Sequence, residues 1–137
     1  GPGGYGIILD WEGHVKELSG GYRKTTNNRM ELLAVIIGLF SLINKPSFVT
    51  IFSDSKYVID SIEKNWVFNW EKKSFKGKKN QDLWKRLLKV YRQHEVRLEW
   101  IKGHNNHPQN ERCDFLALES AKASFLNIDE FYEKITK

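Results

Sequence analysis

The sequence has one cysteine and three prolines among its 137 residues, and it has no long apolar run. The single Cys113 cannot form an internal disulfide, and no stretch approaches the roughly 20 apolar residues that a membrane-spanning helix needs. The first residues, GPGGYG, have neither the basic head nor the apolar body of a signal peptide. We therefore expect an intracellular, cytoplasmic protein in which Cys113 is a small buried side chain rather than a reactive thiol.

The chain also has no internal repeat, no low-complexity tract and no linker rich in Pro or Ser. A chain of this length can bury about two-thirds of the surface that its unfolded form exposes. We expect residues 1–137 to form a single domain with its own hydrophobic core.

Positive charge is concentrated in one stretch of the sequence. The net charge is +5, but residues 63–92 hold ten Lys or Arg against three acids, so this stretch carries +7 and the remainder −2. Five aromatic residues lie within it: Trp66, Phe68, Trp70, Phe75 and Trp84. Basic side chains interleaved with rings favour nucleic acid over a membrane or an acidic protein as the partner, and a solvated lysine-rich helix face is the alternative.

Side-chain periodicity predicts an α/β protein. Residues 5–13 and 14–22 alternate apolar and polar side chains, as paired strands of a hairpin do. Residues 29–43 are apolar nearly all round and predict a buried helix, and residues 47–53 are apolar on both faces, as in an inner parallel strand. The remaining expected elements are helices at about 55–63, 81–93 and 109–123 and a strand at 95–101.

Three acids stand near the starts of helices that are expected to abut the sheet. Asp54 directly follows an apolar strand, where helix capping alone would explain it. Glu31 heads the buried helix and Asp114 lies one turn into the last helix, and a buried carboxylate without a partner is costly. Together the three acids could share a divalent cation, which would offset their burial and repulsion.

Six motifs occur in the order and with the approximate spacing of the type 1 ribonucleases H, namely GPGGYG, TTNNRMEL, FSDSKYV, NWVFNW, DLW and KGHNNHPQNERCDFLA. The chain resembles the bacterial members of this family over residues 1 to about 120. The resemblance implies a ribonuclease H-like α/β fold, with a mixed five-stranded sheet flanked by helices. It also implies a monomeric endonuclease that hydrolyses the RNA strand of RNA/DNA hybrids and leaves 5′-phosphate and 3′-hydroxyl ends.

The resemblance assigns the catalytic residues. Glu31, Asp54 and Asp114 match three of the four acids with which the family holds two magnesium or manganese ions. Such a cation pair activates the attacking water and stabilises the departing oxygen. His104 of KGH matches a loop histidine that takes part in proton transfer or product release.

The resemblance also assigns the substrate contacts. Asn27 and Asn28 are expected to face the shallow minor groove, where 2′-hydroxyls distinguish RNA from DNA, although helix capping could explain the same residues. Trp66 matches a tryptophan that packs against a sugar of the DNA strand. The full expected set is Thr26, Asn27, Asn28, Lys56, Trp66, Trp70 and the lysines of the family's basic protrusion, Lys72, Lys73, Lys76, Lys78 and Lys79.

The sequence departs from the family in two places. Lys56 stands where related bacterial enzymes often carry glutamine. The lysine adds a candidate contact to a phosphate, and it puts in doubt the contact to a base edge that the glutamine would make. The family's first strand, with a DGS-type motif and the first metal-binding aspartate, has no match, and Asp10 does not replace it because it lies in the hairpin. We expect a strand upstream of Gly1 to carry the fourth acid and to lie between the hairpin and residues 47–53, whose apolar strand needs hydrogen-bonding neighbours on both edges.

Two other functions stay open. A hybrid-binding module that no longer cuts is the main alternative, because the fourth acid is not visible, and a magnesium-dependent cleavage assay separates the two. A DNA-processing relative such as an integrase or transposase shares the fold but is disfavoured by NNRMEL and by the tryptophans and lysines. Cleavage of duplex DNA would support it.

Overall fold

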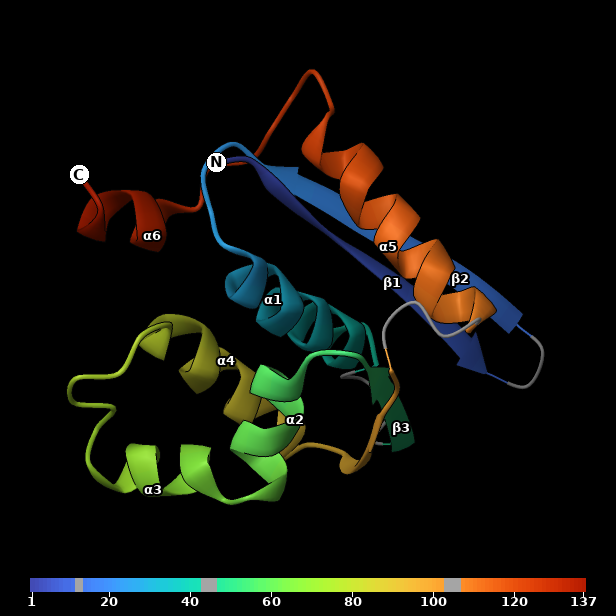
Figure 1. Cartoon of the computed structure of the whole chain (residues 1–137). Helices are drawn as coiled ribbons and strands as arrows, with labels where there is room; N and C mark the ends of the chain where they lie inside the picture. The colour runs from blue at the N-terminus through green and yellow to red at the C-terminus, as the bar shows by residue number, and fades with distance from the viewer. Residues whose placement is uncertain (12–13, 43–46, 103–106) are drawn as a thin grey trace.

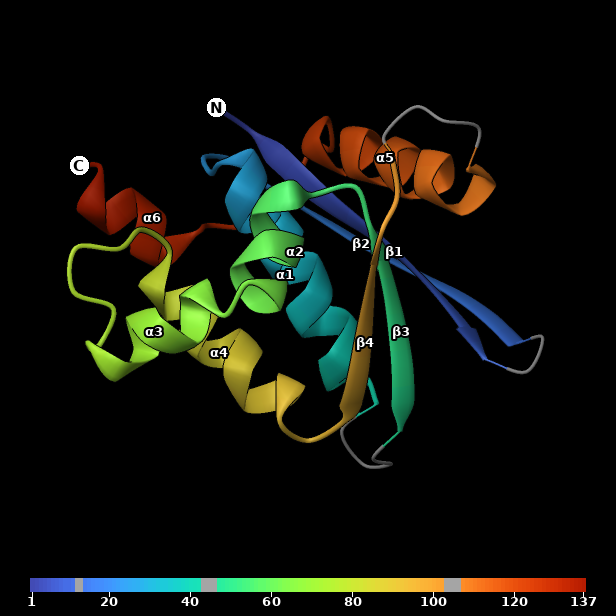
Figure 2. The same ribbon diagram turned by 60° about the horizontal axis from the view of Figure 1, so that its bottom comes forward.

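The computed structural model describes residues 1–11, 14–42, 47–102 and 107–137. In these ranges the chain forms two separate pairs of strands with six helices packed around them (Figures 1 and 2). The α/β class predicted from the sequence is confirmed, and the two strand pairs account for four strands of the expected five-stranded sheet.

Strands β1 (Gly3–Trp11) and β2 (His14–Tyr22) form the predicted antiparallel hairpin, in which Ile7 is opposite Leu18. Helix α5 (Pro108–Ala121) lies along this hairpin, and α1 (Asn27–Phe40) packs against its other face (Figure 1). Glycine is required where α5 crosses β1, because a methyl group at Gly4 or Gly6 would overlap backbone carbonyl oxygens of α5. The close contact with α5 thus explains the glycine-rich start of the sequence.

Strands β3 (Phe48–Ser53) and β4 (Glu95–Trp100) run parallel and side by side, with Thr50 opposite Arg97 (Figure 2). Val49 and Ile51 pack against the helical core, whereas Phe48 and Phe52 on the opposite face are exposed. In the described part of the chain, β3 pairs with β4 only, and β1 and β3 are not hydrogen-bonded to each other. Each strand pair therefore has an edge that faces the other pair without joining it.

The hydrophobic core lies between α1 and three further helices, α2 (Lys56–Glu63), α3 (Trp66–Lys72) and α4 (Gln81–Tyr91). Its fully buried apolar side chains are Leu32, Leu39, Val58, Val67, Trp84, Leu87 and Leu88. Helix α1 is buried along most of its length, as its nearly uniform apolar sequence predicts.

The predicted elements begin and end within three residues of those observed. Two short helices were not predicted: α3, inside the basic stretch, and α6 (Glu130–Ile135) near the C-terminus. The chain reaches α6 by way of Asn127, which adds to the edge of β2 through a bridge with Tyr22. Among the helices that the structure describes, none combines the length and the hydropathy that crossing a membrane would require.

Candidate active site

A groove of ≈ 980 Å³ lies between the two strand pairs and is bounded by α1 and α5. The three carboxylates predicted from the sequence, Glu31, Asp54 and Asp114, all line this groove. The structure thus brings together acids from α1, from the end of β3 and from α5, which are far apart in the sequence.

Local structure explains why Asp54 is available to the groove. The N-cap of α2 is Ser55, whose hydroxyl accepts a hydrogen bond from the amide of Val58 at 3.2 Å. Capping therefore does not explain Asp54, and that alternative is wrong. The carboxylate of Asp54 instead accepts a long hydrogen bond of 3.4 Å from the side chain of Asn110 on α5.

Asp114 lies in the second turn of α5. The helix begins with Pro108, and the side chain of His107 caps it by accepting from the amide of Asn110 at 3.1 Å. Beside Asp114, Cys113 is half-buried and lines the same groove. Burial raises the pKa of the Cys113 thiol, and the charge of Asp114 raises it further, so the thiol stays protonated at neutral pH.

The three predicted carboxylates of the groove influence one another electrostatically. Burial raises the pKa of Glu31 from its ordinary 4.5 to about 7, and the charges of Asp54 and Asp114 contribute to the rise. Among the described residues, no group of three or more His, Cys, Asp or Glu side chains is arranged so that it could hold a metal ion. The chemistry of the donors nevertheless fits a hard divalent cation, because carboxylate oxygens are its preferred ligands and its charge would relieve their repulsion.

The fourth predicted catalytic residue cannot be placed, and Asp10 was not expected to replace the missing acid. His104 lies outside the described residues. Asp10 is exposed near the end of β1, opposite Val15, as its place in the hairpin predicts, and it also lines the groove.

The predicted substrate contacts on α1 stand at its first turn. Thr26 is the N-cap, and its hydroxyl accepts from the amide of Arg29 at 3.2 Å. Asn27 and Asn28 follow it with exposed side chains and line the groove that holds the carboxylates. Because Thr26 caps the helix, the two asparagine side chains are available for another partner.

Lys56 also lines the groove, at the first turn of α2. Its ammonium group lies 4.5 Å from the ring centroid of Trp100, at the end of β4. A cation held against an aromatic face is partly positioned before any ligand arrives. Trp100 was not singled out from the sequence because it stands in no pattern that marks it. Asn110 lies in the motif KGHNNHPQNERCDFLA, but it is uncharged and nothing in the motif distinguishes it from its neighbours.

The basic segment, residues 72–79, follows α3 and is separate from the groove lining. Its five lysines, Lys72, Lys73, Lys76, Lys78 and Lys79, are all exposed. Lys78 lies 5.1 Å from the ring centroid of Trp70, and Trp70 in turn packs edge-on against Trp84.

Most aromatic rings of the basic stretch pack into the protein and do not lie beside the lysines at the surface. Phe75 is 3% exposed and Trp84 is fully buried, whereas Phe68 and Trp70 are partly buried against the core. Trp66, 44% exposed, is the only one of the five rings that is largely open to solvent. Phe75 adopts φ = 57°, a conformation that is strained for a bulky residue, and its burial holds the basic segment against the helices.

A family model and curated proteins match most of the chain. The family model described as RNase H matches residues 1–122. The protein named Ribonuclease H from Lachnoclostridium phytofermentans is 50% identical over 143 residues, which cover 97% of this chain and 90% of that protein. The protein of the same name from Desulforamulus reducens is 50% identical over 134 residues, which cover 94% and 84%.

Solved structures show the same fold. The crystal structure of LC9-RNase H1, described as a type 1 RNase H with the type 2 active-site motif, matches with a TM-score of 0.81 and 27% identity over 99% of this chain and 72% of that one. A foamy viral protease–reverse transcriptase in complex with RNA/DNA hybrid matches with a TM-score of 0.72 over 86% of this chain and 17% of that one. At 22% identity, the second likeness concerns the fold alone.

Proposed function

The chain belongs to the ribonuclease H family, and from this membership we propose that it hydrolyses the RNA strand of RNA/DNA hybrids. The observation that carries the proposal is the convergence of Glu31, Asp54 and Asp114 on one groove, where burial and mutual repulsion raise the pKa of Glu31. Acids gathered in this way are destabilising unless a cation or a proton neutralises them.

Magnesium or manganese ions, two per site, are the proposed cofactors, and Glu31, Asp54 and Asp114 would hold them. When bound, such cations activate water and neutralise the charge that develops on the scissile phosphate. Asn110, which already donates to Asp54, would keep that carboxylate oriented toward the groove. His104 is the proposed group for proton transfer or product release.

The protein's own side chains would choose the substrate. Asn27 and Asn28 line the groove beside the carboxylates, so a hybrid seated there would offer its minor-groove 2′-hydroxyls to their amide groups. Thr26 would fix the turn from which they project. Lys56, positioned against Trp100, would meet a phosphate near the site of cleavage.

A second contact region would hold the DNA strand. Trp66 would pack against a sugar, with Trp70 beneath the basic segment, and the five exposed lysines of residues 72–79 would neutralise phosphates. Because this region is separate from the groove, it would contribute to binding and not to the chemical step.

We further propose that the groove receives an extended strand from upstream of Gly1 that carries the fourth acid. This is supported by the edges of β1 and β3, which face the groove and are not bonded to each other in the described ranges. A strand placed there would join the two pairs into one mixed five-stranded sheet and bring a fourth carboxylate to the other three. We propose a cytoplasmic monomer as the working form.

A substrate panel tests the proposed function. The protein is incubated with an end-labelled RNA/DNA hybrid and with duplex DNA of the same sequence, with magnesium and with a chelator. We expect magnesium-dependent cleavage of the hybrid only. Hybrid binding without cleavage would favour the non-cutting module, and cleavage of duplex DNA would favour the DNA-processing relative.

A further inference from the structure

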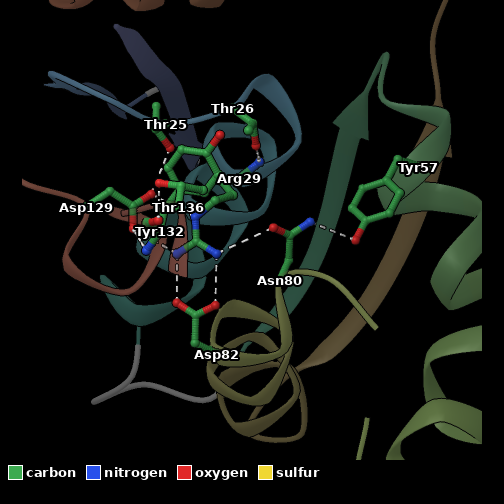
Figure 3. Close-up of polar contacts among 9 residues, drawn as sticks. All are labelled: Thr25, Thr26, Arg29, Tyr57, Asn80, Asp82, Asp129, Tyr132 and Thr136. Carbon is green, nitrogen blue, oxygen red and sulfur yellow. Dashed lines mark hydrogen bonds and ion pairs between the residues drawn. The ribbon is translucent and has the colours of Figure 1, made fainter. Parts of the chain in front are cut away.

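The side chain of Arg29, in the first turn of α1, is a buried charge with a complete set of partners (Figure 3). The residue is 1% exposed, and all five N–H donors of its guanidinium group have an acceptor. Two bonds of 2.7 and 2.9 Å go to Asp129, two of 2.8 and 2.7 Å go to Asp82, and a longer one of 3.4 Å goes to Asn80. Such a site fixes the position of its members because each unmade bond would leave a buried charge unsatisfied.

Asp129 reaches this site from the C-terminal part of the chain, where it also caps α6. Asp129 is 7% exposed, and one oxygen of its carboxylate accepts from the hydroxyl of Thr25 and from Nε of Arg29, each at 2.7 Å. Burial alone would raise the pKa of Asp129, but the hydrogen bonds from Arg29 and Thr25 outweigh it and lower the pKa. The carboxylate is thus ionised and doubly bound at neutral pH.

Thr25 and Arg29, which donate to one oxygen of Asp129, flank the Asn27–Asn28 pair. Thr25 precedes the turn and is itself buried, and Arg29 follows it. Between them, Thr26 caps the helix, and the two asparagines project outward with exposed side chains. One carboxylate oxygen therefore ties down both ends of the segment from which the asparagines project.

The same site also reaches the other proposed contact regions. Asn80 and Asp82 belong to the start of α4, directly after the basic segment. The side-chain amide of Asn80 donates to the hydroxyl of Tyr57 at 3.1 Å, and Tyr57 follows Lys56 in α2. Arg29 and its partners thus connect the C-terminal segment to the asparagine turn, the basic segment and the start of α2 (Figure 3).

We infer that Asp129 is a positioning residue for hybrid recognition, which acts through Thr25 and Arg29 to hold Asn27 and Asn28 in the orientation that reads 2′-hydroxyls. The inference rests on the proposed function. It gives the C-terminal segment, residues 127–136, a part in substrate discrimination in addition to its packing on the body of the protein.

The test compares Asp129→Asn with Glu133→Gln in the full chain. Glu133 makes a bidentate pair with Arg23 at 2.9 Å, between the same two parts of the chain, but at the surface and without contact to Arg29. Affinities for an RNA/DNA hybrid and for duplex DNA of the same sequence are measured with a chelator present, at a temperature at which circular dichroism shows each variant to be folded. The ratio of the two affinities is the readout, because a smaller folded fraction would weaken both equally.

We expect Asp129→Asn to lower the preference for the hybrid roughly tenfold, the value of one or two well-oriented hydrogen bonds, and Glu133→Gln to leave it unchanged. Thr25→Val keeps the Arg29–Asp129 pair and should lower the preference for the hybrid by a smaller factor. This variant provides the test if Asp129→Asn does not fold. Folded Asp129→Asn or Thr25→Val protein with the wild-type preference would overturn the inference and leave the proposed function standing. A wild-type protein without any preference for the hybrid would instead overturn the proposed function, and this inference with it.

Discussion

At the scale of single residues, Glu31 shows how the groove departs from an ordinary protein surface. It is held on a buried helix, and burial together with Asp54 and Asp114 raises its pKa to about 7. Folding thus places an acid where its charge is unfavourable unless a cation is bound. A rise of this size from 4.5 corresponds to about 3 kcal/mol between the charged and the neutral forms.

Replacing Glu31 by Gln removes that charge at nearly constant volume. In metal-free wild-type protein, Glu31 keeps its proton between pH 4.5 and about 7 when folded and has released it when unfolded, so wild-type stability falls as the pH rises through this window. We expect Glu31→Gln to exceed the wild type above pH 7 by up to about 3 kcal/mol and to lose this advantage below pH 4.5. Urea unfolding across this pH range, with a chelator present, measures the difference.

Glu63→Gln, at an exposed position of α2, is the matched control and should change the free energy of unfolding by less than about 0.5 kcal/mol at any pH. If Glu31→Gln were as stable as the wild type at pH 8, the charge of Glu31 would not be unfavourable in the folded protein, and neither its burial nor the nearby carboxylates would have the effect described.

At the scale of elements, the basic segment is an irregular connection between α3 and α4 that is anchored to the core. Ser74, Phe75 and Gly77 have positive φ, and the segment is held to the core by buried Phe75 and by a 2.8 Å bond from the backbone amide of Phe75 to the carbonyl of Trp70. The lysines around it therefore project from a fixed frame. Fixed charges lose less conformational entropy on binding than charges on a mobile loop.

Replacing Lys72, Lys73, Lys76, Lys78 and Lys79 by Ala should weaken hybrid binding and flatten its salt dependence. Each lost phosphate contact removes about 0.9 from the slope of log K against log salt concentration. The cleavage rate at saturating substrate should change little, because these residues are separate from the groove lining. Binding titrations at several salt concentrations measure the slope.

The control for this variant replaces exposed lysines elsewhere, Lys16, Lys122, Lys134 and Lys137, and should keep the wild-type slope. An unchanged slope in the five-lysine variant would mean that the basic segment is only a solvated surface.

The predictability of each element depended on the length and clarity of its pattern. The hairpin alternates apolar and polar residues, α1 is apolar nearly all round and β3 is apolar on both faces, and all of these were predicted closely. Helix α3 was missed because it is only seven residues long and begins after Asn65 in a left-handed conformation, so no periodic face develops. The burial of Phe75 and Trp84 was missed because composition places a ring in a basic stretch without saying which way it points.

The same limit applies to the site. Its acids were predicted because each stands at the start of a helix and in a family motif, whereas Asn110 is connected to Asp54 only by the folded chain. Arg29 and Asp129 are 100 residues apart, so no local pattern could pair them. An arginine in a helix that is otherwise almost entirely apolar was nevertheless a signal, because a buried charge requires a partner.

At the scale of the whole molecule, two strand pairs share one core but not one sheet in the described ranges. If an upstream strand joins them, the backbone amides along the open edge of β3 should exchange rapidly in a chain that starts at Gly1 and slowly in a longer form that includes the upstream residues. Hydrogen exchange of the two forms, followed by mass spectrometry, measures this. Equal protection of β3 in both forms would show that the groove does not take a strand.

The most direct test of the central claim is a comparison of the wild type and Asp54→Asn on one hybrid whose two strands carry different labels. We expect the wild type to cut the RNA strand in the presence of magnesium and to leave the DNA strand whole. Asp54→Asn removes a proposed ligand charge and almost no volume, so it should keep its affinity for the hybrid. Its rate of RNA cleavage should fall far below a tenth of the wild-type rate. A folded Asp54→Asn protein that retains more than about a tenth of the wild-type rate would contradict the claim that the groove carboxylates carry out the reaction.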